Sequence, residues 1–200
     1  MQEKRGIAGF ILIAMGILII GMIGWFMLSY NTIVLKEEQV KTTWSQVESN
    51  LQRKLDLLPN LVKVVKRYAI HEKELLSEIT KLRAQAGRIV SEGKVPDSKD
   101  IAELQKMQKQ LDGATLKLFA VAENYPELKS SEQFLQLQSQ IEGTENRINI
   151  TRMQFNDAVG SYNAYLRHIP ANIVASIGGF KPKAYFTADA EAHQKLKLEL

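Results

Sequence analysis

Residues 7–28 read IAGFILIAMGILIIGMIGWFML and contain no charged side chain. As a helix rising about 1.5 Å per residue, this run would be roughly 33 Å long, which is enough to cross a hydrocarbon core of about 30 Å. A helix also satisfies its own backbone hydrogen bonds where no water is present. The run therefore predicts one transmembrane helix, with residues 1–6 as a short basic N-terminus before it.

A cleaved signal peptide is the alternative to a permanent anchor. Signal peptides have a shorter apolar core and small residues at the cleavage site, whereas this run ends in the bulky sequence WFMLSY at 25–30. Those aromatic residues suit the headgroup region of a bilayer, or they are simply bulky apolar side chains. Two glycines seven residues apart share one helix face, but the run contains no Gly-x-x-x-Gly pairing motif. The predicted anchor residues are Ile7, Gly9, Gly16, Trp25, Phe26, Leu28 and Tyr30.

Beyond the anchor, apolar residues recur at helical spacing. The first set recurs in steps of three or four residues and consists of Val40, Trp44, Val47, Leu51, Leu55, Leu58, Val62 and Val65. No glycine or proline lies between Leu28 and Leu58, so we expect the transmembrane helix to continue into the soluble domain and to bend at Pro59.

Three further helical patterns follow the first. One spans 75–90, another begins near Asp97 or Ser98, and the last opens at Ser130 and ends at Pro170. Aspartate and serine are typical N-terminal caps, and no stretch shows the alternation of a strand. We therefore predict an all-α fold, in which a single N-terminal transmembrane helix continues into an antiparallel four-helix bundle over 29–170.

The C-terminal part, residues 171–200, differs from the bundle. Residues 171–177 could form a short helix that Gly178 and Gly179 end, and the charged residues from Asp189 could form a terminal helix or fray. Between them lies an aromatic and basic segment that we expect to contact a partner protein or lipid. Deleting the chain from residue 180 onward should then leave the bundle folded. The residues of this candidate interaction surface are Phe180, Lys181, Lys183, Tyr185 and Phe186.

Several ordered motifs resemble one known family. They include WSQV at 44–47, DLLPNLV at 56–62, FAVAENYPELK at 119–129, EGTENRI at 142–148 and FNDAV at 155–159. In this order they resemble the LemA family, from Tyr30 to Phe186. The resemblance implies a bacterial single-pass membrane protein with a helical bundle and with no assigned enzymatic activity or cofactor.

Motifs for catalysis or metal binding are absent from the sequence. A di-metal helical bundle uses Glu-x-x-His pairs, but no glutamate lies three residues before His71, His168 or His193. The sequence has no cysteine and no His-Glu-x-x-His motif, which excludes thiolate chemistry and one common type of zinc site. We therefore expect a protein that is not an enzyme and that has no metal site and no cofactor.

Glu142 and Glu145 lie three residues apart on the fourth predicted helix. Paired carboxylates could act in acid–base catalysis, but we favour a structural polar network, because a carboxylate that points inward needs a cation beside it. Arginine was the expected cation. The predicted network is Arg53, Arg67, Glu142, Glu145 and Arg147.

These features favour a membrane-anchored adaptor or scaffold for other envelope or membrane proteins, one that could also form a homo-oligomer. A membrane-tethered sensor or binding module for a small ligand or lipid is the alternative. The net charge of +4 is small and dispersed, with Lys63, Lys66 and Arg67 as its densest patch, so nucleic acid is not an expected partner. We expect the chain in the bacterial inner membrane. The signal-anchor layout favours a bundle outside the cytoplasm, although basic residues flank the anchor on both sides.

Overall fold

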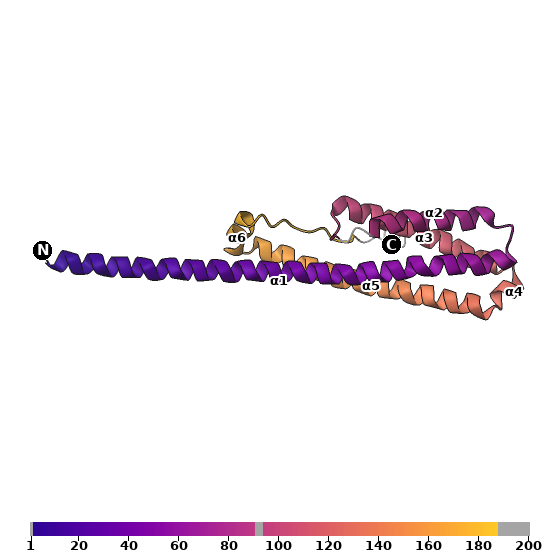
Figure 1. The fold of residues 1–200 in the computed structure, drawn as a ribbon, viewed down its shortest axis with the longest axis horizontal. Coiled ribbons are helices and arrows are strands. Elements are labelled where there is room, and N and C mark those ends of the chain that lie inside the picture. The colour runs from indigo at the N-terminus through magenta and orange to yellow at the C-terminus, as the bar shows by residue number, and fades with distance from the viewer. Residues whose placement is uncertain (1, 91–93, 188–200) are drawn as a thin grey trace, which may run out of the picture. The chain divides into compact units, whose positions relative to one another are not determined.

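The computed structural model describes residues 2–90 and 94–187, with side chains from residue 12 onward. Every regular element in these residues is a helix, which confirms the all-α prediction (Figure 1). Pro59 lies inside the first helix and does not end it. The helices are α1 (Gln2–Tyr68), α2 (Lys73–Val90), α3 (Ser98–Ala122), α4 (Pro126–Lys129), α5 (Glu132–Arg167) and α6 (Ala171–Ile177).

The chain forms two compact units, each built from segments that are distant in the sequence. We call the first the anchor unit; it combines residues up to 39 with residues 160–182. We call the second the bundle unit; among the described residues it combines 40–90 and 94–159 with 183–187. The predicted terminal segment from Asp189 lies outside the described residues.

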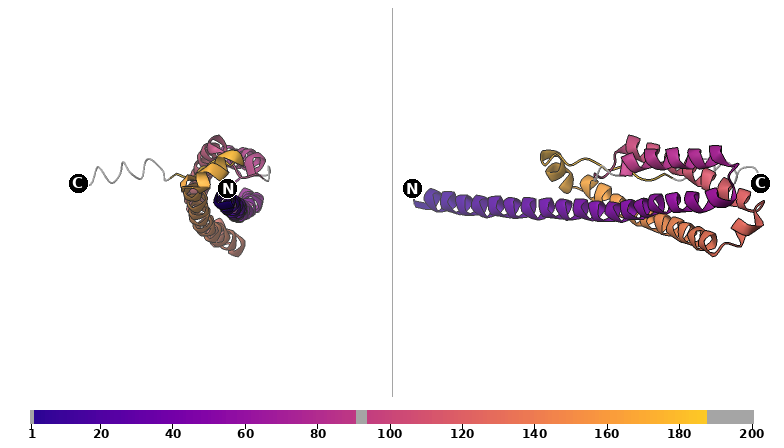
Figure 2. Two further views of the ribbon diagram at one scale, coloured as in Figure 1. Left: turned by 90° about the vertical axis from the view of Figure 1, so that its left-hand side faces the viewer. Right: turned by 45° about the vertical axis from the view of Figure 1, so that its right-hand side comes forward.

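The bundle unit contains α2, α3, α4 and parts of α1 and α5, and α2 and α3 lie side by side (Figures 1 and 2). On α1 the buried residues follow a strict heptad of steps of four and three, in which one member is a lysine. The members of this heptad are Val40, Trp44, Val47, Leu51, Lys54, Leu58, Leu61 and Val65.

The start of α3 has the predicted cap. The Asp97 carboxylate accepts hydrogen bonds from the backbone N–H groups of Lys99 at 2.7 Å and Asp100 at 2.9 Å. Asp100 in turn accepts from the Asp97 N–H at 3.2 Å, so the two aspartates form a capping box. The backbone N–H groups of Asp100 and Lys99 hold the pKa of Asp97 below its usual range.

In the anchor unit, burial of α1 begins just after the apolar run. Leu28 is 70% exposed, whereas Ser29 and Ile33 are buried. Lys36 of α1 contacts α5 here: its Nζ donates a hydrogen bond to Ser161 Oγ at 2.7 Å. Burial, followed by the charge of Glu37, raises the pKa of Tyr162 to about 12, so this phenol stays neutral.

Helix α6 begins and ends as the sequence predicts. The Gly178 N–H donates to the Val174 carbonyl at 2.8 Å, and Gly179 has a φ of 71°, a left-handed conformation that favours glycine. A Cβ on Gly178 would lie 2.6 Å from the Phe180 ring, so a side chain there would force this ring away. After this turn the described chain, up to residue 187, contains no helix.

Candidate functional site

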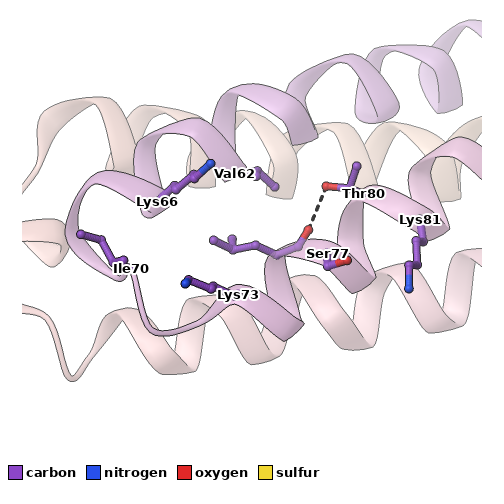
Figure 3. Close-up of a pocket in the computed structure, with 8 residues that line it drawn as sticks. Val62, Lys66, Ile70, Lys73, Ser77, Thr80 and Lys81 are labelled. Carbon is purple, nitrogen blue, oxygen red and sulfur yellow. Dashed lines mark hydrogen bonds between the residues drawn. The ribbon is translucent and has the colours of Figure 1, made fainter.

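A groove of about 630 Å³ lies between the end of α1 and the start of α2, beside the turn of residues 69–72 (Figure 3). Its apolar part combines Ile70, which is 59% exposed, with the buried Leu76 and the half-buried Val62. The hydroxyl of Thr80 donates to the Leu76 carbonyl at 2.8 Å and so is already used inside α2. The remaining lining residues are Lys66, Lys73, Ser77 and Lys81.

The three lysines of the groove have no carboxylate within ion-pair distance among the residues that the structure describes. Glu74 and Glu78 lie on the neighbouring face of α2, where they line a separate hollow with two of these lysines. The groove therefore offers an apolar floor with three lysines at its rim that form no ion pair in the described structure. Such a surface suits a ligand that carries both apolar groups and negative charge.

A buried polar network lies elsewhere in the bundle unit. Lys54 of α1 forms ion pairs with Asp112 of α3 and Glu145 of α5. The lysine side chain is only 2% exposed, whereas the two carboxylate side chains are 40% and 32% exposed. Three helices are thus joined through one desolvated cation. Burial raises the pKa of Glu145, and it outweighs the opposing attraction of Lys54.

The predicted polar network named the wrong cation: a lysine, not an arginine, pairs with the partly buried glutamate. Glu145 does take part, but the structure places Lys54 beside it, and the predicted Arg53, Arg67 and Arg147 are exposed. Glu142 is also exposed and accepts a hydrogen bond from Gln138 at 2.9 Å. Arg53 fails because the residue next to a heptad position points about 100° away from it on a helix. The strict heptad on α1, with a lysine at one core position, was the signal that could have identified Lys54.

The predicted interaction surface is corrected at Phe186, which is a core residue. Its ring is 7% exposed and lies 6.3 Å from Trp44 and 5.6 Å from Phe155. The Arg152 guanidinium lies over the same ring, 4.8 Å from its centroid. Asn156 also binds the Phe186 backbone twice, accepting from its N–H and donating to its carbonyl, both at 2.9 Å.

The other four residues of the predicted interaction surface differ in exposure and in what they contact. Tyr185 is 42% exposed, Lys181 is exposed and Lys183 is half-buried. Phe180 is half-buried and packs edge-on against Tyr30 of α1, with 5.4 Å between ring centroids. The sequence did not indicate which residues of this segment are buried. Its aromatic residues pack against distant helices, and their spacing follows no helical or strand period.

Among the predicted anchor residues, Leu28 is 70% exposed and Tyr30 is 40% exposed. Trp25 and Phe26 are half-buried, and nothing lies within 4 Å of the position that a Cβ on Gly16 would occupy. The surroundings of Ile7 and Gly9 lie outside the part of the chain that the structure describes with side chains. By length and composition α1 can cross a membrane, and only 6% of its most apolar window is buried.

No group of three potential metal-binding side chains (His, Cys, Asp or Glu) occurs in the described residues. The absence of enzymatic activity stays a prediction. The observations together define a class: an all-α protein in which a helix able to cross a bilayer leads into a helical bundle with a basic groove.

The sequence model of the LemA family matches residues 43–199, and the chain belongs to this family. The magnetosome protein MamQ 2 of Paramagnetospirillum magneticum is 26% identical over 190 residues, which cover 84% of this chain and 68% of that protein. Magnetosome protein MamQ of Magnetospirillum gryphiswaldense is 27% identical over 187 residues, with the same coverage. Protein LemA of Metamycoplasma hominis is 25% identical over 145 residues, which cover 72% of this chain and 63% of that protein.

Proposed function

We propose that this protein is a non-enzymatic, membrane-anchored adaptor or scaffold, and that the groove between α1 and α2 binds another envelope protein. The observation that carries the proposal is the apolar groove with Lys66, Lys73 and Lys81 at its rim and no carboxylate paired with them in the described structure. Membership of the LemA family and an N-terminal helix able to cross a membrane support the anchored location.

The chemistry of the groove selects an amphipathic acidic segment as the partner element. A helix can lay its apolar face into a hydrophobic groove, and acidic residues beside that face would then meet the lysines. The acidic flanks would guide association, and the apolar face would supply most of the affinity. Burial of Ile70, which is 59% exposed, would be part of that gain.

The proposal places the bundle unit outside the cytoplasm of a bacterial cell, anchored in the inner membrane by α1. Protease added to intact spheroplasts should then digest the bundle. Protection of the bundle would reverse this orientation. Self-association of the chain is compatible with a scaffold, and cross-linking in detergent would reveal it.

A photoreactive residue at Ser77 tests the adaptor. Ser77 is exposed and lines the groove, whereas Ser45 is exposed on α1 away from it and serves as the matched control. In cells that carry the full chain, we expect Ser77 to cross-link one protein through an Asp- and Glu-rich peptide, identified by mass spectrometry. Lys66→Glu with Lys73→Glu should abolish this adduct. Equal adducts from both positions, or an adduct that survives the charge reversal, would contradict groove binding.

The alternative is a tethered binding module for a small anionic lipid or similar amphiphile. It is favoured by the groove volume, which falls in the range of about 300–1,000 Å³ typical of small-molecule sites. Dodecanoate is a suitable probe, and native mass spectrometry of the full chain in detergent would measure its binding. Saturable binding that the double charge reversal abolishes, with no protein adduct at Ser77, would favour this alternative over the adaptor.

A further inference from the structure

Helix α6 is apolar on two opposite faces. Ala171, Val174 and Ala175 are buried against the anchor unit, while Ile173 and Ile177 point the other way and are 54% and 69% exposed. Ile169, directly before the helix, is 86% exposed. A short helix that leaves a row of isoleucines in water leaves apolar area uncovered, and such a surface is typical of a contact with lipid or another protein.

The position of α6 in the anchor unit indicates that its exposed isoleucines contact lipid and not another protein. The chain after α6 places Phe180 against Tyr30, two residues beyond the uncharged run 7–28. The first buried residue of α1 among those described with side chains is Ser29. The isoleucines are therefore held beside the end of the segment that we assign to the bilayer, where headgroups meet acyl chains.

The charge of the surrounding sequence fits the same place. Residues 160–182 contain no aspartate or glutamate, and their exposed Arg167 and Lys181 are basic. Basic side chains beside an apolar face are typical of helices that lie in the interface of a membrane with anionic lipids. A protein partner would need a complementary surface positioned beside the end of the apolar run. The charges around α6 give no indication of such a partner.

We propose that α6 is an interfacial helix, whose Ile169, Ile173 and Ile177 insert among lipid acyl chains at the membrane surface. This rests on the proposed anchoring through α1 and adds a second membrane contact to it. The two contacts, one spanning and one lying in the interface, would fix the rotation of the anchor unit about the axis of α1. A plain tether would leave that rotation free.

Spin labels test this proposal on the full chain, because it has no native cysteine to compete for the label. Nitroxides would be placed at Ile173→Cys and Ile177→Cys, which are exposed positions, so the core is not disturbed. Leu18→Cys reports on the apolar run, and Asn172→Cys is a matched control on the polar side of α6. The protein would be reconstituted into vesicles of phosphatidylcholine and phosphatidylglycerol, with helical circular dichroism as a check on folding.

The measurement compares how often each nitroxide collides with oxygen, which concentrates in lipid, and with a water-soluble nickel complex. We expect oxygen to dominate at 18, 173 and 177, and nickel access to be several-fold higher at 172 than at 173. If the label at position 18 is in lipid while those at 173 and 177 are as accessible to nickel as the label at 172, the proposal of an interfacial helix is wrong, and the membrane anchor is still supported. Shielding of 173 and 177 from both reagents would mean a protein contact and would also overturn the proposal. If 18 itself is open to nickel, the anchor fails, and the interfacial helix fails with it.

Discussion

Lys54 makes the stability of the bundle unit depend on two carboxylates from other helices. Its side chain is 2% exposed, so the ion pairs with Asp112 and Glu145 replace nearly all of the hydration of its ammonium group. We expect Lys54→Ala to lower the free energy of unfolding by about 1–3 kcal/mol, because it leaves the partly buried carboxylates of Asp112 and Glu145 without their cation. Urea unfolding followed by circular dichroism would measure this loss.

The exposed ion pair of Lys129 with Glu123 is the matched control, since both side chains are more than half exposed. Lys129→Ala should cost at most about 1 kcal/mol. The double variant Lys54→Met with Glu145→Gln should recover part of the loss, because it removes charge on both sides of the pair. Equal costs for Lys54→Ala and Lys129→Ala would show that the buried network contributes no special stability.

Glu145 also predicts a pH dependence. Because burial raises its pKa in the folded protein, the folded state binds the proton more tightly than the unfolded chain does. The corresponding stabilisation is present below the ordinary glutamate pKa and is lost as the pH rises through the higher folded value. Relative to Glu145→Gln, the wild-type protein should therefore gain stability as the pH falls into the ordinary glutamate range. Urea titrations of both proteins at a series of pH values would test this, and a constant difference between them would contradict it.

The roles of single residues could be predicted from the sequence where they depend only on neighbouring residues in the chain. Asp97 could be predicted as a cap because an N-terminal cap depends on the next few residues only. Lys54 was missed because the identity of its partners depends on which faces of three helices meet, and pairwise spacing within one helix carries no such information. Its position in the heptad shows that it is buried, but not which carboxylates pair with it.

At the element scale, the chain after α6 acts as a strap, which we define as residues 183–187. Phe186 closes the aromatic cluster of Trp44 and Phe155, and Gln105 donates to the Thr187 carbonyl at 2.7 Å. We expect Phe186→Ala to lower the free energy of unfolding by about 3 kcal/mol, as for other buried phenylalanines. The near-ultraviolet dichroism of Trp44 should weaken as well, because its ring loses a stacked neighbour.

Tyr185→Ala is the matched control for the strap, because it removes an adjacent aromatic ring that is 42% exposed. It should change stability by less than about 0.5 kcal/mol, as surface substitutions usually do. If both variants are equally stable, the strap is not part of the core. The same reasoning reverses the expectation that deletion from residue 180 leaves the bundle intact, since that deletion removes Phe186.

The helices themselves were largely predictable, because apolar spacing near 3.6 residues identifies a buried face without knowledge of what covers it. Cap and glycine signals gave the start of α3 and the end of α6, but neither these signals nor apolar spacing separated the short α4 from α5. Pro126 begins α4 and Glu132 begins α5, whereas we predicted a single start at Ser130. The groove could not be predicted, because it depends on how α2 returns along α1 after the turn at 69–72. Only Lys66 of its lysines stood out, in the basic patch.

For the whole molecule, the anchor makes a direct prediction. If α1 spans the bilayer, the full chain should resist extraction from membranes by alkaline carbonate, while deletion of residues 7–28 should release it. The mass of the mature protein should include the apolar run. Carbonate extraction of the full chain would contradict the anchor, and a mass that lacks the run would indicate a cleaved signal peptide.

The aromatic cluster also bears on how the protein is made. Trp44 leaves the ribosome early, Phe155 much later, and Phe186 later still, so the core of the bundle unit is incomplete during most of translation. Lys54 likewise waits for Asp112 and Glu145. A chain that completes its core only with a late segment remains unfolded while it is synthesised. If the bundle unit is exported, as we propose, secretion machinery that threads an unfolded polypeptide would not first have to unfold a finished domain.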